Sequence, residues 1–174
     1  MKDPITIQRI EWIHPALRPE ARTIYDKIEK ALSNQNMVCR FARTLSSFKE
    51  QDKIYNQGRY GNPGPIVTDA RGGFSYHNYG LAIDVVFVLD KDKNGTYETP
   101  SWDFKGDFDG DHKADWQEVD EIFKSHGWTG LYKKDKTRWD LPHFQKTLGF
   151  SVHQLYNMHI AGKVDKDGYV ILTK

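Results

Sequence analysis

The chain has 174 residues, which is long enough for one domain with a substantial hydrophobic core. Its 25 lysine and arginine residues balance 24 aspartate and glutamate residues, so net charge does not favour binding to nucleic acid or to an anionic membrane. Hydrophobic residues make up 38% of the chain, which excludes a disordered protein, and no apolar run is long enough to cross a membrane. We expect a globular monomer that neither binds nucleic acid nor inserts into a membrane.

The N-terminal part predicts one helix and one strand. The start, MKDPITIQRIEWIHP, lacks the apolar core of a secretion signal, so we expect synthesis in the cytoplasm without an ordinary signal peptide. Pro19 opens a helix that ends near Ser33-Asn34, and residues 37–42 follow as a short strand. Cys39 is the only cysteine, which excludes an internal disulfide, and beside Val38 we interpret it as a small buried hydrophobic residue.

Helix-capping patterns and turn-forming residues divide the middle of the chain. Ser47 with Glu50 forms a capping box for a second helix, which Gly58 ends. A loop rich in glycine and proline covers residues 58–73, and residues 82–89 form an apolar strand.

A long polar insertion, residues 90–114, follows that strand. Asp115 is predicted to cap the next helix with Glu118 as its reciprocal partner, and Gly127 ends this helix.

The C-terminal part predicts a strand, a helix and a hairpin. The strand covers Trp139–Leu148 and is interrupted by Pro142, Ser151 caps a helix through His159, and Asp167-Gly168 turns a hairpin. Short strands and separate helices without regular βαβ alternation indicate an α+β fold in a single domain, residues 1–174.

Three side chains of metal-ligand type lie at the expected strand edges: His77, Asp84 and His143. Imidazole nitrogen and carboxylate oxygen are zinc ligands, and a catalytic zinc site uses three protein ligands with one position open for water. Gly80 lets the chain turn between the first two. A fourth group must move the water's proton, and Asp140 is the candidate. An offset of three residues from His143 places it on the opposite face of a regular strand, but Pro142 disfavours regularity there.

The string SYHNYGLAID, residues 75–84, resembles the S-x-H-x-x-G-x-A-x-D motif of the VanY-like D-alanyl-D-alanine carboxypeptidase family of zinc metallopeptidases. The resemblance implies that His77 and Asp84 are zinc ligands. It also implies that Asp140-Leu-Pro-His143 supplies the catalytic base and the third ligand. Within ARTLSSFKEQDKIYNQGR, Arg43 matches the arginine that steadies the substrate or the oxyanion; a surface salt bridge is the alternative. Ser75 is expected either to bind substrate or to cap the turn.

This resemblance runs from about residue 40 to 148, and the expected C-terminal helix and hairpin at 150–174 lie outside it. It is greatest for phage and bacillus-type L-alanyl-D-glutamate endopeptidases, whose last motif also reads D-x-P-H-F-Q. It implies a small antiparallel sheet that carries zinc and is flanked by helices. It also implies cleavage of the peptidoglycan stem peptide in the bacterial cell wall by a phage-type endolysin or a wall hydrolase. A D,D-carboxypeptidase that removes terminal D-alanine is the alternative enzyme. A catalytically silent, metal-stabilised wall-binding module is the alternative of another class.

Two acidic segments have features of calcium-binding loops. In DFDGDHKADWQE, oxygen-bearing side chains occupy loop positions 1, 3, 5, 9 and 12. These are Asp107, Asp109, Asp111, Asp115 and Glu118. Position 6 is His112 instead of glycine, and the predicted capping box already accounts for two of the residues, so a solvated acidic loop is the alternative. The second segment, residues 90–101, begins with acidic residues and a glycine but ends at Ser101 instead of glutamate.

Overall fold

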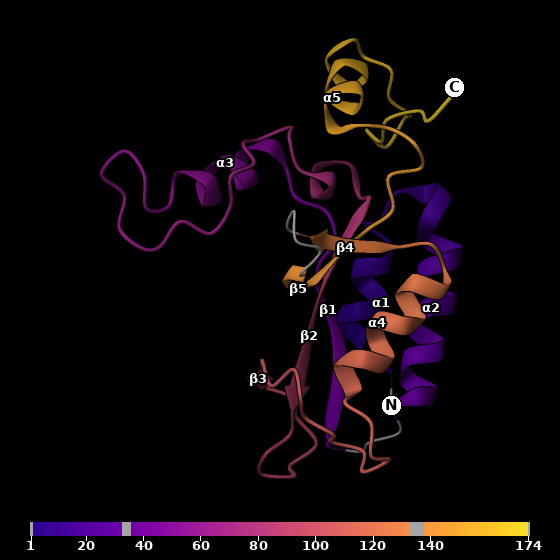
Figure 1. Cartoon of the computed structure of the whole chain (residues 1–174). Helices are drawn as coiled ribbons and strands as arrows, with labels where there is room; N and C mark the ends of the chain where they lie inside the picture. Colours follow the sequence, from indigo (N-terminus) through magenta and orange to yellow (C-terminus); the bar gives the residue numbers. More distant parts are fainter. Residues whose placement is uncertain (1, 33–35, 133–137, 174) are drawn as a thin grey trace.

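A computed structural model describes residues 2–32, 36–132 and 138–173. Figure 1 shows helices packed beside a small sheet, which confirms the expected α+β class. The helices are α1 (Pro4–Ile10), α2 (Arg18–Ala31), α3 (Phe48–Asn56), α4 (Asp115–Ser125) and α5 (Val152–Ile160), with short 3-10 turns η1 (Pro15–Leu17) and η2 (Tyr76–Tyr79). The strands are β1 (Met37–Arg43), β2 (Ala82–Leu89), β3 (Thr99–Ser101), β4 (Thr129–Tyr132) and β5 (Arg138–Gln145).

The sheet is antiparallel and is built around β2. Its order is β1-β2-β5-β4, and β3 also pairs with β2. Along the edge of β2 away from β1, β5 pairs with the first half of the strand and β3 with the second half, as the partners Asp84↔His143 and Phe87↔Ser101 show. The two ends of β2 therefore have different neighbours, and only the end near Asp84 contacts β5.

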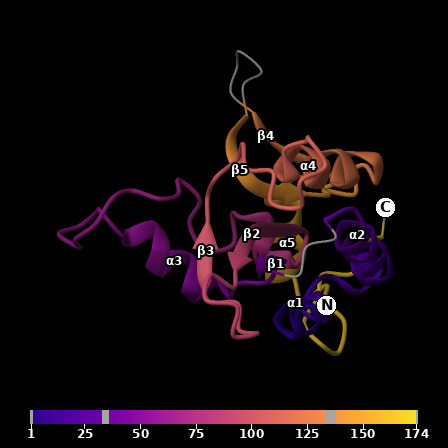
Figure 2. The ribbon, with the colours of Figure 1, turned by 90° about the horizontal axis from the view of Figure 1, so that it is seen from below.

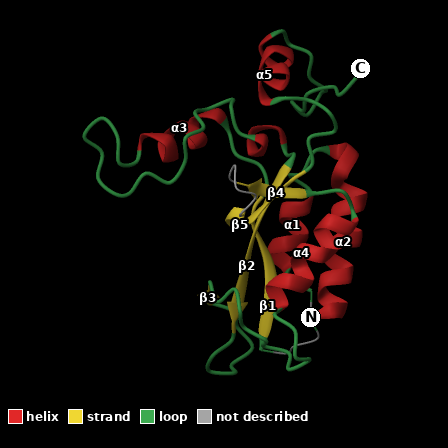
Figure 3. Cartoon of the chain, viewed as in Figure 1, coloured by secondary structure: helices red, strands yellow, loops and turns green. Residues whose placement is uncertain are grey.

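The two faces of the sheet have different surroundings. Ile83, Val85 and Phe87 point into the main core, whereas Val86 and Val88 form a small separate cluster with Val38. Helices α1, α2 and α4 cover the main-core face, and α3 lies on the other side of the sheet (Figures 2 and 3). Because side chains alternate along a strand, Asp84 shares the face of Val86, which those three helices do not cover.

Aromatic packing fixes the orientation of β5. The ring of Phe144 stacks on Phe123 of α4 with centroids 4.0 Å apart, and Phe123 also lies 6.0 Å from the ring of Phe41 on β1. With Phe144 pointing into the core, its two neighbours in sequence, His143 and Gln145, point to the opposite face. The core thereby turns His143 toward Asp84.

Most predicted helix starts are confirmed. Ser47 and Ser151 each form a capping box with the residue three positions later, as expected. The capping role predicted for Asp115 is wrong: Ala114 is the N-cap, and Asp115 is the first residue of α4 with its Oδ2 accepting the N–H of Phe108 at 3.2 Å. Glu118 therefore has no reciprocal partner at this helix start.

Some boundaries differ from those expected. The predicted end of α2 near Ser33-Asn34 lies outside the described residues, and the described helix ends at Ala31. The last strand ends at Gln145, before the expected Leu148, and the C-terminal hairpin is reduced to one bridge between Val164 and Val170. The elements α1, β3 and β4 are too short to give a clear periodic pattern.

Two further expectations concern Cys39 and the membrane. Cys39 is buried, and burial raises the pKa of its thiol well above the ordinary value, as expected for a structural residue. Within the described ranges, none of the helices has the length and apolar character that a membrane crossing requires.

Candidate metal centre

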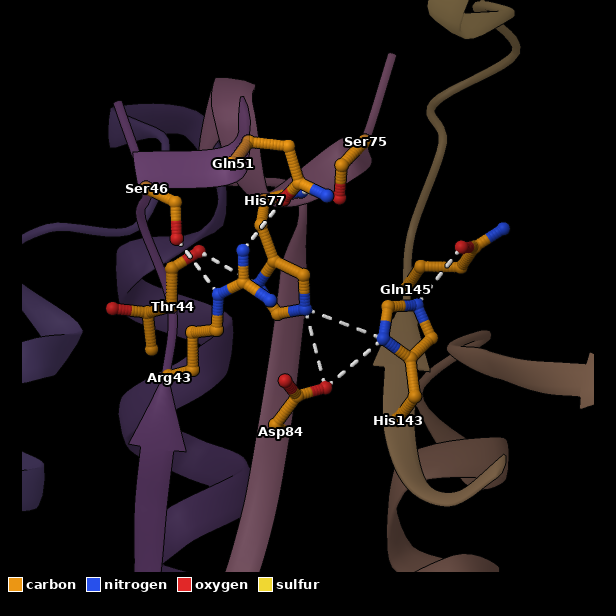
Figure 4. A network of polar contacts seen from close by, with 9 residues as sticks. All are labelled: Arg43, Thr44, Ser46, Gln51, Ser75, His77, Asp84, His143 and Gln145. Atoms are coloured by element: carbon orange, nitrogen blue, oxygen red, sulfur yellow. Dashed lines mark hydrogen bonds and ion pairs between the residues drawn. The ribbon is translucent and has the colours of Figure 1, made fainter. Parts of the chain in front are cut away.

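Three side chains converge on the uncovered face of the sheet (Figure 4). His77 Nε2 lies 3.1 Å from Asp84 Oδ1 and 3.3 Å from His143 Nδ1. Asp84 Oδ1 lies 3.0 Å from His143 Nδ1. Three atoms of metal-ligand type thus form a small triangle, as the sequence pattern led us to expect.

Strand pairing brings two of these residues and Arg43 into one row. Arg43 pairs with Asp84 across β1 and β2, and Asp84 pairs with His143 across β2 and β5. Directly opposite residues in an antiparallel pair project to the same face of the sheet. The row therefore places a guanidinium, a carboxylate and an imidazole side by side on three neighbouring strands.

The turn η2 brings His77 to this row. Ser75 caps the turn by accepting the N–H of His77 at 3.3 Å, which supports the capping interpretation of this serine. Gly80 ends the turn in the left-handed conformation, with φ of 67°, and an added Cβ would lie 2.6 Å from the backbone nitrogen of His14. Glycine is required there for both reasons.

Each histidine is held through the ring nitrogen that points away from the triangle. His77 Nδ1 lies 3.2 Å from the carbonyl oxygen of Thr44, and His143 Nε2 lies 3.0 Å from Gln145 Oε1. Both partners are acceptors, so a neutral imidazole with its proton on the outer nitrogen would present the lone pair of its inner nitrogen to a metal ion. Gln145 was not predicted as a site residue, although its position two residues after His143 on one strand was a usable signal.

The charges in the triangle depend on one another. Burial alone would raise the pKa of Asp84, but interactions with His77 and His143 hold that pKa below its ordinary value. Burial alone would lower the pKa of His143, but the hydrogen bond and charge of Asp84, together with Gln145 and Asp140, raise it. The carboxylate therefore stays ionised and favours a positive charge at the centre of the triangle.

A bulge in β1 turns Arg43 toward this site. Phe41 pairs with Val85 and Arg43 with Asp84, so two steps along β1 match one step along β2. Phe41 points into the main core, and a regular strand would send Arg43 to the same side. The extra residue places Arg43 opposite Asp84 instead.

The guanidinium of Arg43 is held by two neighbours. Its Nε donates to Ser46 Oγ at 2.7 Å, and its Nη2 donates to Gln51 Oε1 at 2.6 Å. Both partners are neutral side chains, so these contacts differ from the surface salt bridge that was the alternative prediction for this arginine. Burial lowers the pKa of Arg43, which the charge of Asp84 partly opposes.

A second irregularity lies in β5. Thr129 pairs with Gln145 and Leu131 with Asp140, so two steps along β4 match five steps along β5. Over such a stretch an offset of three residues no longer forces opposite faces. Asp140 is half-buried, and its charge contributes to the raised pKa of His143. The carboxylate thus interacts electrostatically with the third corner of the triangle.

The triangle fits a small tetrahedral cation. With metal–ligand bonds near 2.0–2.1 Å, ligand atoms around zinc are roughly 3.3–3.4 Å apart. The three separations here are 3.0, 3.1 and 3.3 Å. Two neutral imidazoles and one carboxylate also match the ligand set of catalytic zinc sites.

Comparisons with known proteins identify the family. The family model described as D-alanyl-D-alanine carboxypeptidase matches residues 68–146, a span that contains the whole triangle. A relative is 43% identical over 135 residues, which are 76% of this chain and 72% of that protein. The chain therefore belongs to the D-alanyl-D-alanine carboxypeptidase family of metallopeptidases.

The relative is the peptidoglycan L-alanyl-D-glutamate endopeptidase CwlK of Bacillus subtilis (strain 168). Among solved structures, the L-Ala D-Glu endopeptidase ChiX of Serratia marcescens matches with a TM-score of 0.48 and 17% identity, covering 83% of this chain and 88% of that one.

Proposed function

We propose that this protein is a zinc-dependent endopeptidase that cleaves the L-alanyl-D-glutamate bond of the peptidoglycan stem peptide. The observation that carries the proposal is the triangle of His77, Asp84 and His143, with ligand atoms 3.0 to 3.3 Å apart. The choice of bond rests on the name of the 43% identical relative. The protein would act on the bacterial cell wall as one domain, residues 1–174.

Each residue of the site has a distinct role in this proposal. His77, Asp84 and His143 would hold the zinc, and when bound the metal lowers the pKa of a water to about 7 and polarises the scissile carbonyl. Asp140 would take the proton of the attacking water and return it to the leaving amine. Thr44 and Gln145 would keep the two imidazoles in the tautomer that presents a lone pair inward.

Arg43 would recognise the negative charge of the substrate. Because Nε and Nη2 are already engaged by Ser46 and Gln51, the guanidinium is pre-oriented in the row beside Asp84. A D-glutamate residue carries a carboxylate close to the bond that is cut, and the reaction itself develops an oxyanion. A planar guanidinium can bind either group.

The bond is tested by mass spectrometry of purified peptidoglycan digested with the zinc-loaded protein. A new amino terminus on D-glutamate is the expected product, and it places the cut after L-alanine. Release of free D-alanine instead would assign the protein to the D,D-carboxypeptidase activity that the family description names. Zinc-loaded protein that forms no product would favour the silent wall-binding module.

Replacing Arg43 with lysine should reduce kcat/KM by roughly 10- to 100-fold, because lysine keeps the charge but loses the oriented pair of hydrogen bonds. Zinc content should not change. Arg40→Lys is the matched control, since Arg40 lies on the same strand and donates Nε and Nη2 to Asp3, both at 3.0 Å, away from the site. Equal kcat/KM values for the two variants would remove Arg43 from substrate recognition.

A further inference from the structure

The acidic loop before α4 lies at the other end of β2 from the triangle of His77, Asp84 and His143. Its first carboxylate, Asp107, accepts backbone N–H groups from Gly110 at 2.7 Å, Asp111 at 3.1 Å and His112 at 2.9 Å. His112 adopts the left-handed conformation with φ of 74°, which supplies the sharp turn expected of a glycine at loop position 6. The chain therefore folds back on itself despite the non-glycine residue.

Five carboxylates of this loop converge in two overlapping groups. Ligand-type oxygens of Asp107, Asp109 and Asp115 lie within 4.8 Å of one another, and so do those of Asp109, Asp111 and Glu118. Asp109 belongs to both groups, so the two form one cluster. Lys113, which follows the turn, extends to Glu121 outside the cluster at 2.6 Å.

Two of these carboxylates each have a buried oxygen that lacks a hydrogen-bond partner, and Asp115 is buried as a whole residue. Over the part of the chain that the structure describes, the buried side-chain atoms without a partner are Asp115 Oδ1, Trp116 Nε1 and Glu118 Oε2. Asp115 is 0% exposed, and burial raises its pKa to about 6, with the charge of Asp109 adding to the effect. A buried carboxylate oxygen without a donor is costly unless a cation binds it.

Helix capping does not account for these two residues. Ala114 occupies the N-cap of α4, and neither Asp115 nor Glu118 closes a capping box there. The alternative of a freely solvated loop also fails at Asp115, which has no exposed surface. Both carboxylates instead point to an ion that satisfies their unpartnered oxygens.

We propose that Asp107, Asp109, Asp111, Asp115 and Glu118 bind one calcium ion. Calcium takes six to eight oxygen ligands in flexible geometry, which suits a carboxylate-rich loop, whereas magnesium demands a regular octahedron and retains several waters. The site is separate from the proposed zinc centre and does not depend on the proposed peptidase activity.

The role of this ion is structural. Trp116 lies in sequence between Asp115 and Glu118, and its ring packs on Phe87 of β2 with centroids 4.7 Å apart and on Phe104 of the insertion at 4.9 Å. Phe108 inside the loop also contacts Phe87, at 6.4 Å. An ion that fixes the loop therefore fixes the polar insertion and the start of α4 against the central strand.

Thermal unfolding of the zinc-loaded protein in calcium-free buffer tests the proposal. For a dissociation constant of about 10 µM, adding about 1 mM calcium should raise Tm by about 5–10 °C. The same concentration of magnesium should give a much smaller shift. Terbium(III), a luminescent substitute for calcium, should show emission excited through Trp116, and calcium should displace it.

Two variants and one control decide whether the response comes from this loop. Asp109→Asn and Glu118→Gln should lose the calcium shift and the terbium emission. Both remove a negative charge from a repulsive cluster, so without calcium they should melt no lower than the parent. Glu121→Gln makes the same charge change on α4 outside the cluster and should keep the full response. Absence of a calcium shift in the parent, or an equal shift in Asp109→Asn, would overturn the proposal.

The second acidic segment gives no comparable support. Asp90 is buried, but its two carboxylate oxygens accept the N–H groups of Asn94 at 3.0 Å and Gly95 at 2.8 Å. Ser101 pairs within the sheet opposite Phe87. Among the described residues of segment 90–101, no three side chains of metal-ligand type converge.

Discussion

Replacing His143 with alanine should abolish zinc binding and catalysis together. The variant removes one corner of the triangle and leaves Gln145 Oε1 without the imidazole that it holds at 3.0 Å. Zinc content should fall from about one per chain to background. Loss of the metal removes several kcal/mol of transition-state stabilisation, so cleavage should slow by about 10³-fold or more. Elemental analysis and a peptidoglycan-release assay measure the two effects.

The matched control is His153→Ala. His153 is exposed on α5, where its ring lies 5.3 Å from that of Phe74 rather than in the triangle. This variant should keep zinc and activity. A His143→Ala protein that retains zinc at the parental stoichiometry, or that still cleaves peptidoglycan, would show that His143 is not a ligand.

Replacing Asp140 with asparagine should separate zinc binding from catalysis. Asparagine has nearly the same shape but cannot accept and return a proton, so kcat should fall by roughly 10²- to 10⁴-fold. Zinc content should stay at the parental level because the triangle is intact. The pH–rate profile measured alongside should lose the limb that reports the base.

Asp26→Asn is the corresponding control. Asp26 is an exposed residue of α2 that pairs with Lys2 at 2.6 Å, on the helical layer that covers the opposite face of the sheet. Its removal should leave kcat and zinc content unchanged. If Asp140→Asn turned over substrate as fast as Asp26→Asn, the proton would have to be carried by another group.

The triangle was predicted from three residues of metal-ligand type together with the family motif, and simple local rules explain why these residues meet. The left-handed Gly80 returns the chain from His77 into β2, which brings together two side chains seven residues apart in sequence. Phe144 had to enter the core, and alternation along the strand then sends His143 outward. Alternation also places Gln145 beside His143, so this positioning residue was within reach of the same reasoning.

The exact surroundings of Arg43 and Asp140 could not be predicted in the same way. Alternation from Phe41 puts Arg43 on the wrong face, and alternation from His143 puts Asp140 on the wrong face. An irregular strand pairing changes the face to which each side chain points, in β1 for Arg43 and in β5 for Asp140. Such irregularities depend on the partner strand, and local sequence carries only an indirect trace of them, such as Pro142.

In the acidic loop, the sequence predicted a helix cap that the structure does not contain. The spacing of Asp115 and Glu118 fits both a capping box and a calcium-binding loop, so the sequence alone does not distinguish the two. The helix in fact begins one residue earlier than a capping Asp115 would require, because Ala114 takes the N-cap. A shift of one residue at the helix start thus removes the capping role of Asp115 and leaves its carboxylate available for the proposed calcium site.

The bulge in β1 also makes the proposed function depend on how this strand pairs. If β1 straightened without a change in length, Ala42 would pair with Asp84, and Arg43 would turn toward the main core. Every proposed ligand, the proposed base and the arginine would remain in the sequence, and the family motifs would be untouched. Among diverged relatives, a substitution at this point that favours regular pairing would therefore mark altered substrate recognition, even where every motif residue is retained.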